Sequence, residues 1–116
     1  MIKNRFSKYN DGMLYVCEAK KKEIDFGAAK NTRKKEDLKK IVKLAYEERT
    51  KREEDLEFAE NRDRSLSIKV KTRLQEQVKA THKVLIENVL YSIIYVDLDK
   101  PNKEMYLYLE EEREIR

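Results

Sequence analysis

Residues 65–74 read SLSIKVKTRL, an alternation of apolar and polar side chains that runs without a break. A period of two places successive side chains on opposite faces of a β-strand. One face would carry Leu66, Ile68, Val70, Thr72 and Leu74, and the other Ser65, Ser67, Lys69, Lys71 and Arg73. The pattern predicts a half-buried strand whose charged face lies in solvent.

The chain that follows predicts further strands. Residues 84–86 (VLI) are a short apolar run, and Glu87-Asn88 is a turn signal. Residues 89–97 (VLYSIIYVD) predict a strand buried on both faces. Its two faces would carry Tyr91, Ile93 and Tyr95, and Leu90, Ile94 and Val96. Residues 99–102 (DKPN) predict a turn. Beyond it Met105, Leu107 and Leu109 alternate with polar residues, so the last two strands should form a hairpin.

Residues 34–62 allow two interpretations. One long helix would place apolar residues at helical spacings and use good helix formers. The alternative is a strand over 40–50, with Val42, Leu44 and Tyr46 inward, followed by a short helix over 52–61. Thr50 with Glu53 three residues later would then start the helix as a capping box. The apolar stripe lapses between Tyr46 and Leu56, which favours the strand followed by a helix.

The N-terminal part predicts one more strand and a loop. Asp11-Gly12 is a turn signal, and residues 13–17 (MLYVC) form an apolar run of strand length. Residues 27–39 are nearly all polar after Gly27-Ala28-Ala29, and we expect a long mobile loop there. The predicted fold is mainly β: a small antiparallel β-barrel or sandwich-like domain with one short helix and a long basic loop.

Composition limits the class of protein. The chain has 116 residues, so we expect a single domain over residues 1–116. The charged fraction is 43%, yet 27 basic and 23 acidic side chains leave a net charge of only +4. The longest apolar run, residues 89–96, is much shorter than the roughly 20 residues of a membrane span. Neither a membrane span nor a signal peptide is expected.

Few residues could support catalysis. His82 is the sole histidine, whereas a metal site needs several ligands. Gly12 and Gly27 are isolated, so no phosphate-binding loop is predicted. Cys17 is the only cysteine and lies in an apolar run, which excludes an internal disulfide and predicts a buried thiol. We therefore expect no enzyme, no catalytic residue, no metal and no cofactor.

The charges are segregated along the chain. Residues 18–43 carry 10 basic and 5 acidic side chains, residues 44–64 carry 5 and 8, and residues 104–116 carry 2 and 5. Blocks of opposite sign suit contacts between copies, and head-to-tail contacts can close into a ring. The acidic residues expected between subunits are Glu47, Glu48, Glu53, Glu54, Asp55, Glu110, Glu111 and Glu112. Residues 110–116 are expected to form an acidic C-terminal tail.

The predicted loop has a second possible use. Lys30, Arg33, Lys34 and Lys35 would give sequence-independent contacts to a phosphate backbone if many copies presented them to DNA. A plain solvated loop is the alternative.

Five segments together resemble a known family. They are LAYEE at 44–48 with the charged piece REEDLEFA at 52–59, the basic strand LSIKVKTR at 66–73, and HKVLI at 82–86 with VLYSIIYVD at 89–97. Residues 105–111 then match a closing strand. The pattern is similar to the head-closure proteins of long-tailed bacteriophages and prophages, also called head-tail joining or head-completion proteins. The resemblance covers about residues 40–112.

The resemblance implies a structural protein of the phage neck. Such proteins form rings, often dodecameric, below the portal and its adaptor, where they close the DNA-filled head, retain the DNA and dock the tail. It implies a location in the virion neck, and in the host cytoplasm during assembly. A long loop of the family points into the channel, and residues 27–39 would be that loop here. The alternatives are a nucleic-acid-binding module that uses Tyr106 and Tyr108 as stacking platforms, and a tail-completion or other neck protein.

Overall fold

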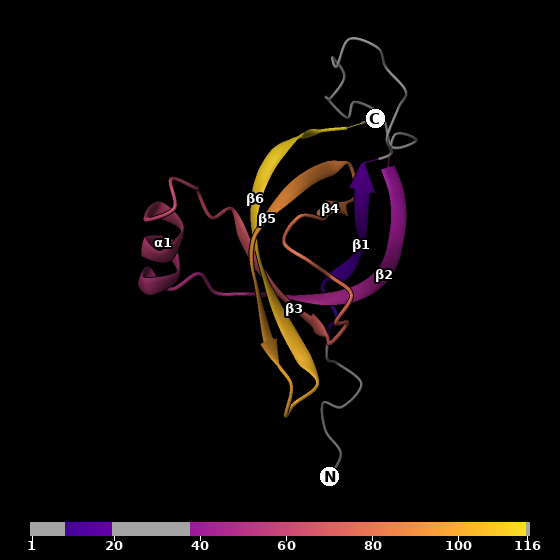
Figure 1. Ribbon diagram of the computed structural model, residues 1–116, viewed down its shortest axis with the longest axis horizontal. Coiled ribbons are helices and arrows are strands. Elements are labelled where there is room, and N and C mark those ends of the chain that lie inside the picture. Colours follow the sequence, from indigo (N-terminus) through magenta and orange to yellow (C-terminus); the bar gives the residue numbers. More distant parts are fainter. Residues whose placement is uncertain (1–8, 20–37, 116) are drawn as a thin grey trace.

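The computed structural model describes residues 9–19 and 38–115 of the chain (Figure 1). This part contains six strands and one helix. They are β1 (Gly12–Ala19), β2 (Leu38–Arg49), α1 (Glu53–Glu60), β3 (Ile68–Arg73), β4 (Lys83–Ile86), β5 (Val89–Asp99) and β6 (Glu104–Glu114). The predicted first strand, the predicted strand after the loop and the last hairpin are all present.

The strands form one closed antiparallel barrel in the order β1-β2-β3-β6-β5-β4. Pairing between β1 and β4, in which Tyr15 lies opposite Leu85, closes the ring of strands. The mainly β fold with one short helix is confirmed, and it is a barrel rather than a sandwich. β1 ends and β2 begins at one end of the barrel, where Ala19 is the register partner of Leu38. The β5–β6 turn lies at the opposite end (Figure 1).

The strand followed by a helix is the correct interpretation of the ambiguous segment. Leu44 and Tyr46 are buried, and Val42 is half-buried against the same core. The predicted capping residues are wrong, however. The helix begins after Arg52, whose backbone N–H donates to Asp55 Oδ2 at 3.0 Å. Asp55 takes this position because it is the acid of the first turn that faces the barrel.

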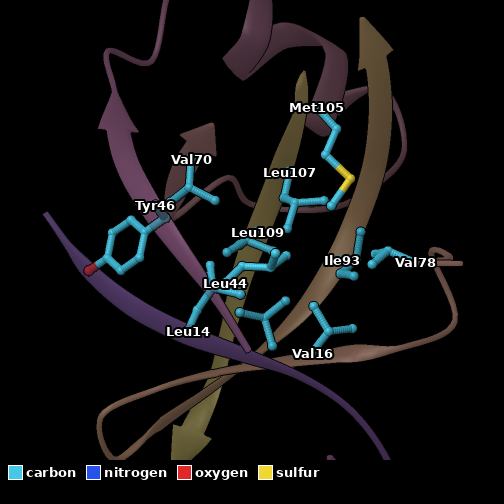
Figure 2. Packing of buried hydrophobic residues seen from close by; sticks show 11 residues of the cluster. Leu14, Val16, Leu44, Tyr46, Val70, Val78, Ile93, Met105, Leu107 and Leu109 are labelled. Atoms are coloured by element: carbon cyan, nitrogen blue, oxygen red, sulfur yellow. The ribbon is translucent and has the colours of Figure 1, made fainter. Parts of the chain in front are cut away.

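The barrel interior is filled from every strand (Figure 2). Leu14, Val16, Leu44, Tyr46, Val70, Val84, Ile93, Met105, Leu107 and Leu109 are buried there, together with Val78 from the β3–β4 connection. Alternation puts Met105, Leu107 and Leu109 on the inner face of β6, and none of the three is exposed to solvent. The inward faces predicted for β2 and β6 are therefore confirmed, and that of β3 is confirmed for Ile68, Val70 and Leu74 but not for Leu66.

Two smaller clusters lie on the outer face of the barrel. One contains Cys17, Leu38, Leu85, Leu90 and Ile115. The other contains Ala59, Leu66, Ile94 and Tyr108, with Phe58 and Tyr106 packed against it. This second cluster fixes α1 over β5 and β6, and Figure 1 shows the helix alone on that side. The helix is thus an external brace on a barrel that has its own core.

The outer face of β3 differs from the sequence prediction. The strand begins at Ile68, because Leu66 turns away to pack under α1. Lys69, expected in solvent, is only 7% exposed. The prediction failed because α1 folds back over this face and covers it.

A β-bulge changes the two faces predicted for β5. Ile93 is the partner of Leu109 and Tyr95 the partner of Tyr108, so Ile94 is the extra residue. The bulge lets Ile93 enter the barrel core while Ile94 and Tyr95 both point to the α1 side. Tyr95, predicted to share a face with Ile93, therefore lies on the other face and is 42% exposed.

Two predicted segments have different boundaries. Residues 110–114 are the end of β6 rather than a tail, and Ile115 is buried with 1% exposure. Leu38 and Lys39, placed in the predicted loop, belong to β2. The rest of that loop lies outside the described residues. It includes the four cations predicted to face DNA, Lys30, Arg33, Lys34 and Lys35.

The β4–β5 turn contains a strained residue that allows a test. Glu87 has φ of 56°, in the left-handed region that costs a residue with a side chain about 1 kcal/mol. We expect Glu87→Gly to raise the free energy of unfolding by about 1 kcal/mol in urea titrations, because glycine adopts this φ without strain. Glu76→Gly is the matched control, since Glu76 is exposed in a turn without positive φ. It should lower stability slightly, and equal effects of the two variants would contradict the explanation.

Candidate functional site

A buried polar cluster fastens α1 to the barrel. Asp55 is 4% exposed, and its carboxylate accepts hydrogen bonds from Lys69 Nζ at 3.0 Å and from the Tyr108 hydroxyl at 3.2 Å. The Arg52 backbone N–H is a third donor. Lys69 also lies 5.2 Å from the centre of the Tyr108 ring. Asp55, predicted to lie between subunits, is instead enclosed within one copy, so that prediction is wrong.

The cluster changes the acidity of its members. Burial alone would raise the pKa of Asp55, but hydrogen bonds from the Arg52 backbone and from Lys69, with the charge of Lys69, hold it below its usual value. Burial and the adjacent Asp55 carboxylate raise the pKa of Tyr108 to about 12. Both shifts favour ionised Asp55 beside a neutral phenol, as the hydrogen bonds require.

The solvent side of α1 has an unusual composition. Glu53, Glu57 and Glu60 are exposed there, and Leu56 between them is 39% exposed. Residues three and four apart share one side of a helix, so Glu53, Leu56 and Glu60 form a stripe. We call Glu53, Leu56, Glu57 and Glu60 the acidic face. Within the described residues, none of these three carboxylates forms an ion pair.

The other acids predicted between subunits have different surroundings. Glu47 lies 3.0 Å from Arg49 and 3.4 Å from Lys71, and Glu54 lies 3.6 Å from Arg52. Glu110 pairs with Arg64, which lowers the pKa of Glu110, and Glu112 pairs with Lys83. Glu48 and Glu111 are exposed. Within residues 9–19 and 38–115 the predicted acids thus form no single block. The three carboxylates of the acidic face are the largest group there that shares one element and forms no ion pair.

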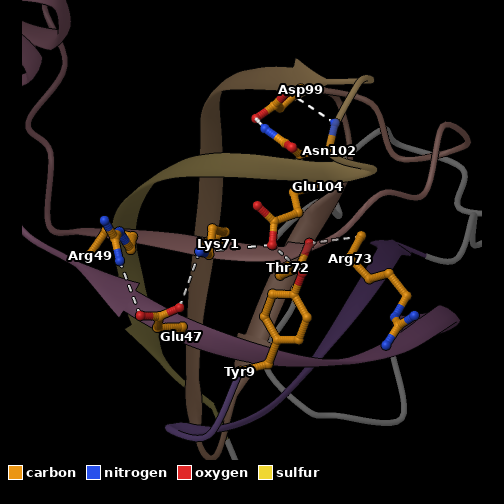
Figure 3. A network of polar contacts seen from close by, with 9 residues as sticks. All are labelled: Tyr9, Glu47, Arg49, Lys71, Thr72, Arg73, Asp99, Asn102 and Glu104. Carbon is orange, nitrogen blue, oxygen red and sulfur yellow. Dashed lines mark hydrogen bonds and ion pairs between the residues drawn. The ribbon is translucent and has the colours of Figure 1, made fainter. Parts of the chain in front are cut away.

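A second polar network lies near the β5–β6 turn (Figure 3). Glu104 is 6% exposed, accepts a hydrogen bond from the Tyr9 hydroxyl at 2.5 Å and lies 3.8 Å from Lys71 Nζ. Burial and the bond to Glu104 raise the pKa of Tyr9 above its usual value. Lys71 also forms an ion pair with Glu47, and Glu47 forms a second ion pair with Arg49. The network holds Tyr9 in place beside the β6 strand.

Next to Tyr9 is a pocket of about 540 Å³ with a basic rim. Tyr9 and Leu74 supply its less polar wall, and Arg73, Lys100 and Lys103 carry its positive charge. We call these five residues the basic pocket. No carboxylate of the described residues forms an ion pair with any of the three cations. Glu76 also lines the pocket, so the local charge is three positive against one negative.

The turn that carries two of these cations is held in one shape. Asn102 Nδ2 donates to Asp99 Oδ2 at 2.9 Å, and the Lys103 backbone N–H donates to the Lys100 carbonyl at 3.0 Å. Figure 3 shows the Asp99–Asn102 contact across the turn. Because the turn is already ordered, a partner that binds it loses little conformational entropy.

Sequence reasoning missed the basic pocket. The turn at residues 99–102 was predicted, but Arg73 and Tyr9 join it only through the pairing of β3 with β6 and the position of the N-terminal segment. The sequence did contain one signal: Lys100 and Lys103 stand on either side of Pro101-Asn102, and both had to be exposed at the tip of a hairpin.

The proposed stacking platform is not formed. Tyr108 is 8% exposed beneath α1, and Tyr106 is half-buried. A nearby pocket of about 340 Å³ is lined by residues of β2, β3, β5 and β6. It contains Arg49, Arg52 and Lys69, but each already lies beside a carboxylate. Neither ring of the predicted platform is therefore fully exposed, and the cations beside it are already paired.

Residues with metal-binding potential are dispersed. His82 is half-buried, its Nδ1 accepts from the Lys79 backbone N–H at 3.1 Å, and its Nε2 lies 3.8 Å from Glu18. Among residues 9–19 and 38–115, no three His, Cys, Asp or Glu side chains gather in a way that could hold a metal ion. The same residues include no helix with the length and apolar character of a membrane span.

Cys17 is the buried free thiol that its sequence context predicts. Its side chain has no solvent exposure, and burial raises the pKa of the thiol to about 11, with Lys40 partly opposing the effect. We expect no reaction with a thiol-specific disulfide reagent at pH 8 in the folded protein, and complete reaction in urea, because the thiolate is the nucleophile. Rapid reaction of the folded protein would contradict this assignment.

No protein-family model matches the chain, and no curated protein matches it.

Proposed function

We propose that this chain is a structural protein of the phage neck, without catalytic activity, that forms a ring below the portal and adaptor, closes the DNA-filled head and docks the tail. One observation carries the proposal. The small closed barrel joins β1 to β2 through residues 20–37, which hold seven Lys or Arg and four acidic residues. Because Ala19 and Leu38 are register partners, this basic segment leaves and re-enters the barrel at one end.

The proposed mechanism is electrostatic. In a ring, every copy contributes Lys30, Arg33, Lys34 and Lys35 to the same channel. Repeated cations contact DNA phosphates without reading sequence, and phosphate neutralises the repulsion between copies. Head-to-tail contacts between identical barrels generate such a ring when their rotation closes.

The test is DNA retention by tail-less heads. In a phage or prophage that depends on this chain, replacing Arg33, Lys34 and Lys35 with Ser should leave rings on the heads but release DNA, measured as nuclease-sensitive DNA per particle. The control replaces Lys39, Lys51 and Lys79, three exposed lysines of the described residues, with Ser. Full retention by the first variant overturns the electrostatic mechanism, and necks that lack this chain altogether overturn the proposed function.

A further inference from the structure

Two surfaces of one copy carry charges of opposite sign, and each includes an apolar group. The acidic face presents an exposed Leu56 among three carboxylates that form no ion pair within residues 9–19 and 38–115. The basic pocket presents an opening of about 540 Å³ among three cations that no carboxylate of the described part of the chain pairs with, and Leu74 and Tyr9 lie in its wall. An apolar side chain surrounded by negative charge on one surface could thus pack against an apolar wall surrounded by positive charge on the other.

The acidic face lowers the intrinsic stability of α1 at its C-terminal end. A helix favours acidic residues in its first turn and basic residues in its last turn. In α1 the first turn is acidic, as expected, but the last turn contains Glu57 and Glu60 and no basic residue. A partner of positive charge on this surface would therefore offset the unfavourable position of Glu57 and Glu60.

One copy does not bring the two surfaces together. α1 lies on the outer side of β5 and β6, whereas the basic pocket lies at the barrel end that carries the β5–β6 turn (Figure 1). Contact between them therefore requires two copies, and each copy keeps one surface available for the next. Such a contact is heterologous, and it builds a ring when the rotation from one copy to the next closes.

We propose that the acidic face of one copy docks into the basic pocket of the next copy. Leu56 packs against Leu74 and Tyr9. Glu53, Glu57 and Glu60 face Arg73, Lys100 and Lys103. This inference rests on the proposed ring and names the surface that would build it. The contact uses the barrel end opposite Ala19 and Leu38, so residues 20–37 are attached away from it.

Charge reversal tests the contact. Variant A carries Glu53→Lys, Glu57→Lys and Glu60→Lys, and variant B carries Arg73→Glu, Lys100→Glu and Lys103→Glu. Every substituted residue is exposed, so both variants should fold, which circular dichroism checks. Each variant alone should self-associate about 100-fold more weakly than wild type in sedimentation velocity at low salt, since three attractive pairs become repulsive.

Mixing the variants is the decisive step. The new lysines of variant A face the new glutamates of variant B. The unchanged acidic face of B faces the unchanged basic pocket of A. An equimolar mixture should therefore regain wild-type assemblies in which the two variants alternate. The matched control is Glu48→Lys, Glu87→Lys and Glu111→Lys, which makes the same charge change at other exposed positions and should assemble as wild type. Leu56→Ser should weaken assembly about tenfold without affecting folding.

The outcomes separate this inference from the proposed function. If wild type forms rings and variants A and B form them equally well, the interface is wrong while the ring stands. If wild type remains monomeric up to about 1 mM at low salt, the contact between copies is overturned. Imaging of particle necks decides the proposed function independently of either result.

Discussion

Replacement of Asp55 by Ala is expected to lower the free energy of unfolding by about 3 to 4 kcal/mol. The substitution leaves the ammonium group of Lys69 buried without its carboxylate, and such a break in a buried pair typically costs about 3–5 kcal/mol. Lys69 is only 7% exposed, so water compensates for the lost partner only in part. A small domain has a total stability of roughly 5–15 kcal/mol, and the loss should be plain in urea titrations.

The double variant Asp55→Ala with Lys69→Met supplies the control. It removes both charges and leaves no buried ion unpaired, so it should be more stable than Asp55→Ala alone. Arg49→Ala removes an exposed cation from a neighbouring ion pair and should change stability by less than about 1 kcal/mol. A double variant no more stable than Asp55→Ala would show that Lys69 does not need a buried partner.

The same carboxylate gives stability a definite pH dependence. In the folded protein the pKa of Asp55 is below its usual value, so the unfolded chain takes up a proton first as pH falls. The stabilisation is fully present above about pH 4, the value of an unfolded aspartate, and is lost as pH falls through the folded pKa. The difference in unfolding free energy between wild type and Asp55→Asn should therefore narrow from pH 5 to pH 2. A constant difference over this range would contradict the assignment.

The second large effect is expected in the barrel core. Leu107 is fully buried on β6, between β3 and β5, among the side chains drawn in Figure 2. Leu107→Ala removes buried methyl groups and leaves a cavity that paired strands on both sides cannot close, so we expect a loss of about 3 to 4 kcal/mol. Urea and thermal unfolding both measure it.

Leu98→Ala is the matched control for this substitution. Leu98 lies on the adjacent strand and is 40% exposed, so the same chemical change should cost less than about 1 kcal/mol. Equal losses from the two variants would mean that the barrel interior is not the main source of stability.

The sequence patterns predicted most strands and the helix correctly, because alternation and helical spacing depend on residues that are close together in the chain. The alternation in residues 68–73 and in β6 follows from the geometry of a strand and one well-packed face. The change of element after Arg49 was visible where the apolar stripe lapsed. The resemblance to head-closure proteins remains a prediction, since no comparison tests it.

What sequence could not show depended on contacts between distant segments. Lys69 was expected in solvent because nothing beside it indicates that α1 would cover it and supply Asp55. Nothing in Ser92-Ile93-Ile94-Tyr95 says which isoleucine is the extra residue of the bulge. The basic pocket combines three separate segments that meet only after the barrel closes.

Closure of the barrel also has a kinetic consequence. β1 pairs with β4 through Tyr15 and Leu85, residues that stand 70 positions apart (85 − 15). Chains dominated by such long-range pairings fold in milliseconds to seconds, because a large loop must be closed before its contacts form. We expect the β4–β5–β6 meander to form early and β1 to join last. A full-length chain that is still folding then exposes an open sheet edge until β1 pairs, and that edge is where misassembly with other chains would begin.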